Sequence, residues 1–379
     1  MTDLLRQEIA AAADTIVVKV GTRVLTHSDG TLDDDRIACL AEELSELIDG
    51  GRNVVLVSSG AVGAGMSQLG IHKRPTDVSK LQAVAAVGQT NLIESYDRTF
   101  RKHGRHAAQV LLTADDFDDR TRYLNVRNTL LALVEFGAVP VINENDTVAV
   151  EELVATFGDN DRLAAMVTNL IRAPLLVILS DVGGLFDGDP DRDGSKIISM
   201  VSELDESIMD LAHDHKAGVS KGGMASKLNA ARIATAAGEN VIIASGREPG
   251  TLARIISGEV VGTLFIAQGK AISPWKRWIG FSARPRGTLL LDAGACRAIT
   301  EQGRSLLAAG IIGASGNFEK GDVISLCDAN KREIARGLTN YRSKEIQQIK
   351  GLKSSQIGQV LGHSPYEEVI HRDNMMVGV

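Results

Sequence analysis

The chain has 379 residues, of which 44% are hydrophobic, 23% charged and 4% aromatic. This is the composition of a globular protein with a large core, and the length predicts two or three domains, so a disordered chain is excluded. The formal net charge of -7 argues against general adhesion to nucleic acid, because that affinity comes mainly from neutralising phosphates.

The cysteines and the apolar runs indicate the compartment. Cys39, Cys296 and Cys327 lie far apart and form no CxxC pair, which favours a reduced protein over a zinc ribbon or a disulfide framework. The N-terminus lacks a basic segment followed by an apolar core, and no apolar run approaches the roughly 18 residues of a membrane span. We therefore expect a cytoplasmic protein without a membrane anchor.

Up to residue 268 one pattern recurs, consisting of a helical stretch, a glycine and a short β-branched run. It is found at residues 44–57, 130–142 and 231–244. Glycine suits the left-handed position that ends a helix, and continuous apolar runs suit strands covered on both faces. Together with the runs at 16–20 and 175–179, the pattern predicts an α/β fold, a three-layer αβα sandwich with a mostly parallel central sheet.

The C-terminal part has a different pattern. Residues 273–287 are rich in proline and basic side chains, which indicates a domain junction. Beyond them, Gly, Asn and Asp turns separate short strand-like runs at 288–291, 323–327 and 333–338. We therefore expect three regions: a large domain at 1–268, a linker at 269–285 and a small β-rich domain at 286–379.

The first predicted strand ends as VVKVGTR at residues 17–23. A glycine just after a strand lets backbone N–H groups approach an anion, and Lys19 can place an ammonium beside them. This combination suits a phosphate group. Taken alone, so short a motif is more simply explained by an ordinary strand and turn with a surface lysine.

The loop SSGAVGAG at residues 58–65 follows the second predicted strand. It matches neither GxGxxG nor GxxxxGK[ST], which excludes the Rossmann and Walker interpretations. The loop still offers N–H donors at a helix start, the usual arrangement for binding carboxylate or phosphate. Close packing of a helix against a strand, which needs small residues, explains the same sequence equally well.

The most informative segment lies at residues 139–146. The apolar run 139–142 ends in the polar sequence NEND, and a second polar cluster, GDND, follows at 158–161. A buried strand that ends in this way presents short polar side chains at the edge of a sheet, where α/β enzymes bind their ligands. Polarity concentrated there predicts a site.

Two later loops also carry polar or basic groups. The run at 175–179 leads into Ser180 and Asp181, and the sequence SKGGMASK at 220–227 precedes a helical pattern. A glycine pair with two lysines at a helix N-terminus predicts an anion site, because lysine there otherwise opposes the helix dipole. We predict no metal site, because no Cys or acidic residue stands at metal-ligand spacing from His103, His106, His213 and His215.

Taken together, these segments resemble the amino acid kinase family, and within it the branch that phosphorylates the γ-carboxylate of L-glutamate in the first step of proline biosynthesis. A C-terminal region similar to a PUA domain follows, and the likeness covers nearly the whole chain. It rests on VVKVGT (17–22), SSGAVGAG (58–65), PVINEND (140–146), GDND (158–161), LSDVGGLF (179–186) and GGMASK (222–227).

The resemblance implies roles for the residues at matching positions. Lys19 and Lys227 are expected to flank the transferred phosphoryl group, and Asp161 to hold these two lysines in place. L-Glutamate is expected to be bound by Ser59, Asp146 and Asn160. The resemblance implies ATP contacts from Lys19, Ser180, Asp181, Lys221, Gly222, Gly223, Met224, Ala225, Ser226 and Lys227.

The nucleotide loop departs from the family pattern, which usually has GTGGM and a TK ending. Here Ser220 and Lys221 take the Gly-Thr positions, and Ser226 replaces the second threonine. These changes alter the side chains that the loop can offer to ATP.

Charge determines the chemistry that the resemblance implies. The side chain of glutamate ordinarily has a pKa of about 4.3 in water, so at neutral pH its carboxylate is already the nucleophile and no general base is required. Repulsion between this anion and the ATP phosphates must be neutralised, by Lys19, Lys227 and a Mg²⁺ ion held mainly by the phosphates. The expected products are L-glutamyl 5-phosphate and ADP.

The sequence leaves alternatives open. One is another member of the same family, acting on aspartate, acetylglutamate, carbamate or UMP. A second is an RNA-binding PUA protein, because residues 284–379 hold 13 Lys and Arg against 10 Asp and Glu. These residues include only three aromatic side chains on which RNA bases could stack, Phe318, Tyr341 and Tyr366, which makes RNA binding the secondary alternative. The family resemblance further implies feedback inhibition by proline and a homo-oligomer, a tetramer or a dimer.

Overall fold

The computed structural model describes residues 3–27, 29–149, 160–190, 192, 194–212, 223–268, 273–362 and 366–378. The chain divides into two compact units. The first comprises Met1–Asp116 and Arg120–Lys270, and the second comprises Phe117–Asp119 and Ala271–Val379. The exact limits of the predicted linker at 269–285 stay a prediction.

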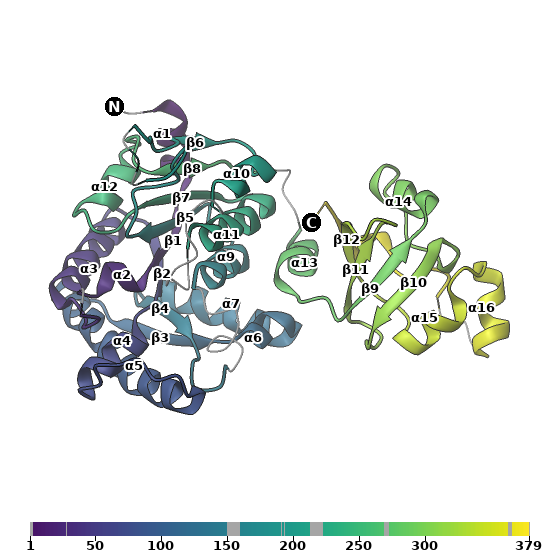
Figure 1. Ribbon diagram of the computed structural model, residues 1–379, viewed down its shortest axis with the longest axis horizontal. Coiled ribbons are helices and arrows are strands. Elements are labelled where there is room, and N and C mark those ends of the chain that lie inside the picture. Colours follow the sequence, from purple (N-terminus) through teal and green to yellow (C-terminus); the bar gives the residue numbers. More distant parts are fainter. Residues whose placement is uncertain are drawn as a thin grey trace. The chain divides into compact units, whose positions relative to one another are not determined.

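An eight-stranded sheet forms the centre of the first unit, in the order β3-β4-β2-β1-β5-β7-β8-β6 (Figure 1). Neighbouring strands run parallel except β7 and β8, which confirms the predicted mostly parallel sheet. The strands are β1 (Thr15–Val20), β2 (Asn53–Ser58), β3 (Ala107–Leu112), β4 (Val139–Glu144), β5 (Leu175–Ser180), β6 (Met200–Val201), β7 (Asn240–Ser245) and β8 (Thr263–Phe265).

Helices cover both faces of this sheet, as expected for a three-layer αβα sandwich. On one face lie α3 (Asp34–Asp49), α5 (Val78–Phe100) and α12 (Thr251–Ile256), and on the other α9 (Asn160–Ile171) and α11 (Met224–Ala237) (Figure 1). The remaining described helices of this unit are α1 (Leu4–Ala12), α2 (Thr22–Leu25), α4 (Ala61–Gln68), η1 (Arg101–His103), α6 (Ala114–Asp118, whose last two residues cluster with the second unit), α7 (Arg120–Glu135) and α10 (Glu206–Asp210). Among the described residues, no helix has the length and apolar character needed to cross a membrane.

The alternation of side chains along β1 decides what faces each helical layer. Val18 and Val20 belong to the core that β1 shares with Leu40 and Leu44 of α3. Because successive side chains of a strand point to opposite faces, Val17 and Lys19 face the layer of α9 and α11. The Lys19 side chain therefore lies buried between the sheet and these two helices, with only 3% of the residue exposed.

Glycines end the helices largely as predicted. Gly137 (φ 73°) follows α7, and Gly238 (φ 100°) caps α11, both in the left-handed region where glycine is favoured. After α3 the left-handed residue is Gly51 (φ 85°), whereas the cap itself, Gly50, has φ -75°. The pattern of a helix, a glycine and a strand is thus confirmed at all three places.

The second unit is built on a five-stranded sheet in the order β10-β9-β11-β12-β13. Its strands include the three predicted runs, as β9 (Gly287–Leu291), β11 (Val323–Cys327) and β12 (Glu333–Leu338), together with β10 (Ile311–Gly316) and β13 (Met375–Val377). A separate core contains Leu289, Leu326, Phe318 and Tyr341. The described helical segments are α13 (Pro274–Arg277), a π-helical turn (Trp278–Ser282), α14 (Ala293–Thr300), η3 (Ala308–Gly310), α15 (Ser343–Ile349), α16 (Ser354–Leu361) and η4 (Arg372–Asn374).

Two glycines bring α4 and α5 into backbone contact. A Cβ atom on Gly65 would lie 1.8 Å from the carbonyl oxygen of Val84, and one on Gly88 would lie 1.8 Å from that of Ala61. Real Cβ atoms do not approach so closely, so both positions require glycine. Part of the glycine content of SSGAVGAG therefore serves close packing, against a helix rather than the strand that we considered.

We expect Gly65→Ala to destabilise the first unit. Because α4 would have to move away from α5, the free energy of unfolding should fall by about 1–3 kcal/mol, the usual range for overpacking. Urea unfolding followed by far-UV circular dichroism measures this change. Gly188→Ala is the matched control, because its Cβ would meet Ser195 Oγ at an ordinary 3.7 Å. Equal stability of the two variants would contradict the packing argument.

Candidate active site

Those predicted site residues that the structure describes gather at the carboxyl edge of the large sheet. Because β1, β2, β4, β5 and β7 run parallel, the residues that follow them meet at one edge, where open α/β sheets bind ligands. Backbone hydrogen bonds join these ends: the Ser59 N–H donates to the Val20 oxygen, and the Gly21 N–H donates to the Leu179 oxygen. Segments far apart in the sequence are thereby held side by side.

Three buried charged side chains form a cluster below this edge. Lys19 Nζ lies 2.5 Å from Asp161 Oδ1, and Lys227 Nζ lies 3.3 Å from Asp161 Oδ2. Asp161 is fully buried, and the two lysines are 3% and 6% exposed. Each ammonium thus contacts its own oxygen of one carboxylate, and the three ionised groups together are cationic.

Helix ends position two members of this charged cluster. Asp161 lies in the first turn of α9, where the helix dipole favours an anion. Lys227 lies in the first turn of α11, where the dipole disfavours a cation, so its ion pair with Asp161 provides compensation. Burial by itself would raise the pKa of Asp161, but the charges and hydrogen bonds of Lys19 and Lys227 outweigh it, so this pKa is lowered and the carboxylate stays ionised.

An amide network adjoins the charged cluster. Asn160, the residue before Asp161, directs its Nδ2 toward three acceptors: the Ser58 carbonyl oxygen at 3.1 Å, Ser59 Oγ at 2.9 Å and Asn143 Oδ1 at 2.8 Å. Because this nitrogen carries two protons, two of the three acceptors share one of them. Asn143 Nδ2 in turn donates to Gln89 Oε1 of α5 at 2.8 Å. The loop after β2, the end of β4 and the start of α9 are therefore joined by neutral hydrogen bonds.

A cavity of about 680 Å³ opens beside this network. Its walls include Ser59, Asn143, Glu144, Asp146 and Asn160. Burial, and secondarily the charge of Asp146, raises the pKa of Glu144 to about 8. Burial also raises the pKa of Asp146 to about 6, although the charge of Arg74 opposes the shift. At neutral pH the cavity therefore holds one mainly protonated and one mainly ionised carboxyl group.

The end of β5 carries two of the residues expected to contact ATP. Ser180 is buried and donates a hydrogen bond from Oγ to Asp181 Oδ1 at 3.1 Å, while Arg23 Nη1 donates to Asp181 Oδ2 at 3.0 Å. Burial alone would raise the pKa of Asp181, but these hydrogen bonds and the Arg23 charge lower it overall. Asp181 is thus an ionised carboxylate whose two oxygens are both oriented.

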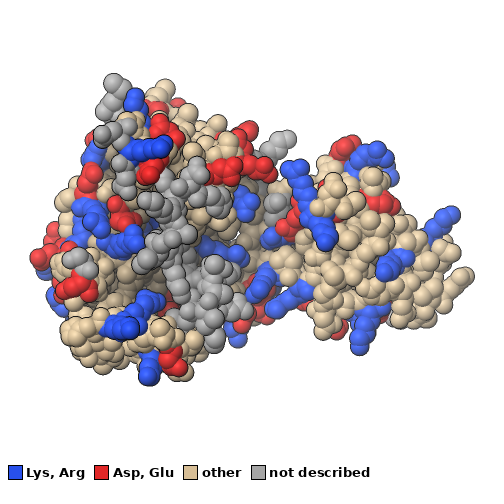
Figure 2. All heavy atoms as spheres, in the orientation of Figure 1, with Lys and Arg blue, Asp and Glu red and all other residues tan. Residues whose placement is uncertain are grey.

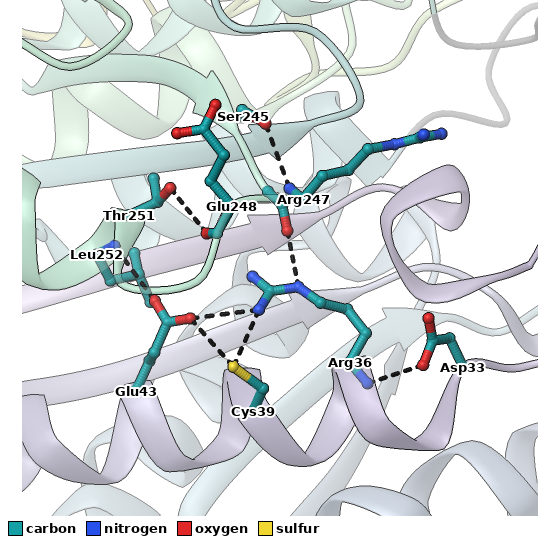
Figure 3. A network of polar contacts seen from close by, with 10 residues as sticks. Asp33, Arg36, Cys39, Glu43, Ser245, Arg247, Glu248, Thr251 and Leu252 are labelled. Carbon is teal, nitrogen blue, oxygen red and sulfur yellow. Dashed lines mark hydrogen bonds and ion pairs between the residues drawn. The ribbon is translucent and has the colours of Figure 1, made fainter.

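Helix α3 holds the loop that follows β7 (Figure 3). Arg36 Nε donates to the Gly246 oxygen at 2.8 Å, and the Gly246 N–H donates to the Ser180 oxygen at 2.7 Å. Arg36 also pairs with Glu43 at 3.3 Å, and Glu43 Oε2 accepts from the Leu252 N–H at 3.3 Å, near the start of α12. The partly buried Arg36–Glu43 pair therefore fixes both ends of this loop beside Ser180.

The structure brings most of the predicted residues together. Lys19, Asp161 and Lys227 form the charged cluster, and the cavity wall contains Ser59, Asp146 and Asn160. Gly223 is the N-cap of α11, whose first residues are Met224, Ala225 and Ser226. Lys221 and Gly222, with the neighbouring Ser220 and the Gly158–Asp159 part of GDND, lie outside the described residues.

Sequence reasoning assigned no role to several residues that complete the site. Asn143 and Glu144 lie within the quoted PVINEND segment, and the alternation of a buried strand could have separated inward from outward positions there. Arg23 stands in the first motif, yet its partner Asp181 is 158 residues away. Gln89 carried no signal, because a single polar residue on a long helix does not indicate which loop it contacts.

Comparisons with known proteins agree with this geometry. The amino acid kinase family matches residues 14–245, and the PUA domain matches residues 287–361. Glutamate 5-kinase of Rhodopirellula baltica is 51% identical over 99% of this chain and 96% of its own length. Glutamate 5-kinase of Moorella thermoacetica is 45% identical over 96% of this chain and 96% of its own length. Glutamate 5-kinase of Synechococcus sp. is 48% identical over 97% of this chain and 100% of its own length. The chain therefore belongs to the amino acid kinase family, and within it to the glutamate 5-kinases.

Proposed function

We propose that this protein transfers the γ-phosphoryl group of ATP to the γ-carboxylate of L-glutamate, giving L-glutamyl 5-phosphate and ADP, the first step of proline biosynthesis. The observation that carries the proposal is the buried Lys19–Asp161–Lys227 cluster beside a cavity with an ionised Asp146. Full-length similarity to proteins named glutamate 5-kinase supports the choice of substrate over aspartate, acetylglutamate, carbamate or UMP.

The two lysines address the main barrier of the reaction, the repulsion between two anions. An ammonium has three N–H donors, so Lys19 and Lys227 can each keep Asp161 as a partner and still donate to a phosphoryl oxygen. Their positions are set before ATP arrives, because Asp161 holds each ammonium on a different carboxylate oxygen. Preorganised charge of this kind stabilises a transition state without reorganisation during the reaction.

The cavity supplies the groups that a free amino acid requires. Ionised Asp146 can pair with the α-ammonium group of L-glutamate, and the Ser59 hydroxyl and Asn160 can hold an oxygen of a carboxylate. Holding both ends of the substrate would align its γ-carboxylate with the phosphoryl group. Because that carboxylate is ionised at neutral pH, no residue has to act as a general base.

ATP is expected at the opposite side of the charged cluster. Ser180 and Asp181 at the end of β5 and the segment 221–227 before and within α11 are the proposed contacts. Mg²⁺ would be held mainly by the ATP phosphates, since both oxygens of Asp161 already contact lysines and no group of three His, Cys, Asp or Glu among the described residues could hold a metal ion. Such an ion would neutralise part of the phosphate charge.

Activity is tested directly with a hydroxamate assay. L-Glutamate, ATP and Mg²⁺ should give γ-glutamyl hydroxamate when hydroxylamine is present, because the acyl phosphate product reacts with it. ADP release should be largest with glutamate in a panel that includes aspartate, acetylglutamate, carbamate and UMP. Faster turnover of any other acceptor in this panel would replace glutamate as the proposed substrate.

Other properties stay predictions. The family resemblance implies feedback inhibition by proline and assembly into a dimer or tetramer, and the PUA-like C-terminal unit implies RNA binding. The separated cysteines favour a cytoplasmic location. On the face drawn in Figure 2, positive and negative side chains are interspersed over the described part of the first unit. RNA binding is expected of residues 286–379, because the similarity to a PUA domain lies there. Repeating the hydroxamate assay with added proline, and measuring RNA retardation at two salt concentrations, tests two of these predictions.

Removing one ammonium should slow the chemical step. We expect Lys227→Ala to lower kcat on the order of a hundredfold or more, by analogy with the loss of a single oxyanion donor. Steady-state kinetics with saturating glutamate and ATP measure the effect. Lys102→Ala is the control and should leave kcat unchanged. Lys102 is an exposed lysine of η1, which precedes β3 and so lies on the side of the sheet where the strands begin, away from the carboxyl edge. A near-normal kcat in Lys227→Ala would falsify the assigned role.

Asp161 is expected to act through the lysines rather than on glutamate. Asp161→Asn should therefore lower kcat while the KM for glutamate changes little, because the lysines lose the charge that positions them. Initial-rate measurements over a range of glutamate concentrations separate the two parameters. A higher KM at constant kcat would instead place Asp161 in glutamate binding.

Glutamate binding should weaken in mild acid. Burial raises the pKa of Asp146 to about 6, and only the ionised carboxylate attracts the α-ammonium group of the substrate. Since the ionised fraction increases with pH through this value, the KM for glutamate should fall from about pH 5 to about pH 7.5. In Asp146→Asn the KM for glutamate should be high at every pH and should no longer change between about pH 5 and about pH 7.5. The KM for ATP is the control and should be similar in both proteins. A wild-type KM that is constant over this range would exclude Asp146 as the ammonium partner.

A further inference from the structure

We infer that Gln89 is a positioning residue for glutamate binding, acting through Asn143 and Asn160 to make the Ser59 hydroxyl a hydrogen-bond donor toward the substrate. This inference rests on the proposed function. Gln89 lies on α5, 7% exposed, and has no expected contact with either substrate. Its influence would pass through three consecutive hydrogen bonds of 2.8 to 2.9 Å.

Backbone groups determine the direction of these hydrogen bonds. The Glu144 N–H can only donate, and it donates to Asn143 Oδ1 at 2.9 Å. The amide of Asn143 must therefore present its oxygen toward Glu144 and its nitrogen toward Gln89. At the other end, the Ser58 carbonyl can only accept, so the Asn160 atom 3.1 Å from it must be the amide nitrogen.

The consequence for Ser59 follows from these two ends. The same Asn160 nitrogen lies 2.9 Å from Ser59 Oγ, so the serine oxygen accepts from Asn160. A hydroxyl has one proton, and here that proton is left to donate into the cavity that Ser59 lines. A hydroxyl donor beside the cavity matches a carboxylate oxygen, which accepts hydrogen bonds and cannot donate when ionised.

Gln89 supplies the acceptor that holds this arrangement in place. Its Oε1 accepts from Asn143 Nδ2 at 2.8 Å, while its own Nε2 is buried without a hydrogen-bond partner among the described residues. A buried unpaired donor is unfavourable. We attribute the orientation of the Gln89 amide, with Oε1 toward Asn143, to the need of Asn143 Nδ2 for an acceptor. Without that acceptor, the buried Nδ2 of Asn143 would be unpaired, and of the two hydrogen bonds that fix the Asn143 amide only the one from the Glu144 N–H would remain.

The test compares Gln89→Met in the wild-type protein and in the Ser59→Ala variant. Methionine has a similar length but offers only a weak acceptor, so we expect the KM for glutamate to rise about tenfold, with kcat and the KM for ATP changing less than about twofold. In the Ser59→Ala background the same substitution should change kcat/KM for glutamate by less than about twofold, because the hydroxyl it positions is already absent. Gln89→Leu gives the same comparison if the methionine variant does not fold.

Ser95→Ala is the matched control on the same helix. Ser95 is also buried and donates a hydrogen bond, to Asp34 Oδ1 at 2.7 Å, on a route that does not lead to the cavity. It should leave the KM for glutamate unchanged even if it lowers the melting temperature.

Three outcomes would overturn the inference: an unchanged KM in Gln89→Met, equal effects of this substitution in both backgrounds, or an equal rise of KM in Ser95→Ala. Absence of glutamate-dependent activity in the wild-type protein would instead refute the proposed function, so the two failures are distinguishable.

Discussion

The site depends on the pairing of one buried carboxylate with two buried ammonium groups. Removing two ammonium groups from water is strongly unfavourable unless an anion accompanies them. Asp161 provides that anion, and the first turn of α9 stabilises its negative charge. The arrangement leaves positive charge in excess, which is the condition that the proposed transfer between two anions requires. In the proposed mechanism, stability and catalysis therefore depend on the same three side chains.

The parallel sheet makes this arrangement possible. Lys19 reaches the layer of α9 and α11 because β1 alternates its side chains between two buried faces. Asp161 and Lys227 reach the same layer because their helices begin beside the carboxyl edge of the sheet. Close packing then limits movement: α4 and α5 touch at Gly65 and Gly88, and the Arg36–Glu43 pair holds the loop beside Ser180.

The site separates its tasks among different kinds of group. In the proposed reaction the charged cluster faces the phosphoryl group, where neutralisation of charge is needed. A neutral amide network borders the cavity proposed for glutamate, where the direction of hydrogen bonds matters more than charge, since an amide distinguishes donors from acceptors. Two carboxyl groups with separate raised pKa values complete the cavity, so one of them can attract an ammonium at neutral pH while its neighbour stays protonated.

Short-range pattern in the sequence predicted the strands and indicated that polar residues after the buried runs lie at the edge of the sheet, because continuous β-branched runs that follow glycines suit buried parallel strands. The individual roles expected of Lys19, Ser59, Asp146 and Asn160 came from the resemblance of their motifs to the amino acid kinase family. The tertiary structure alone decided the partners. Gln89 meets Asn143 from 54 residues away, Arg23 meets Asp181 from 158 residues away, and Gly65 meets α5 at the carbonyl of Val84. Such contacts depend on how helices cross the sheet, and a linear pattern of hydrophobic and polar residues carries no information about a single long-range hydrogen bond.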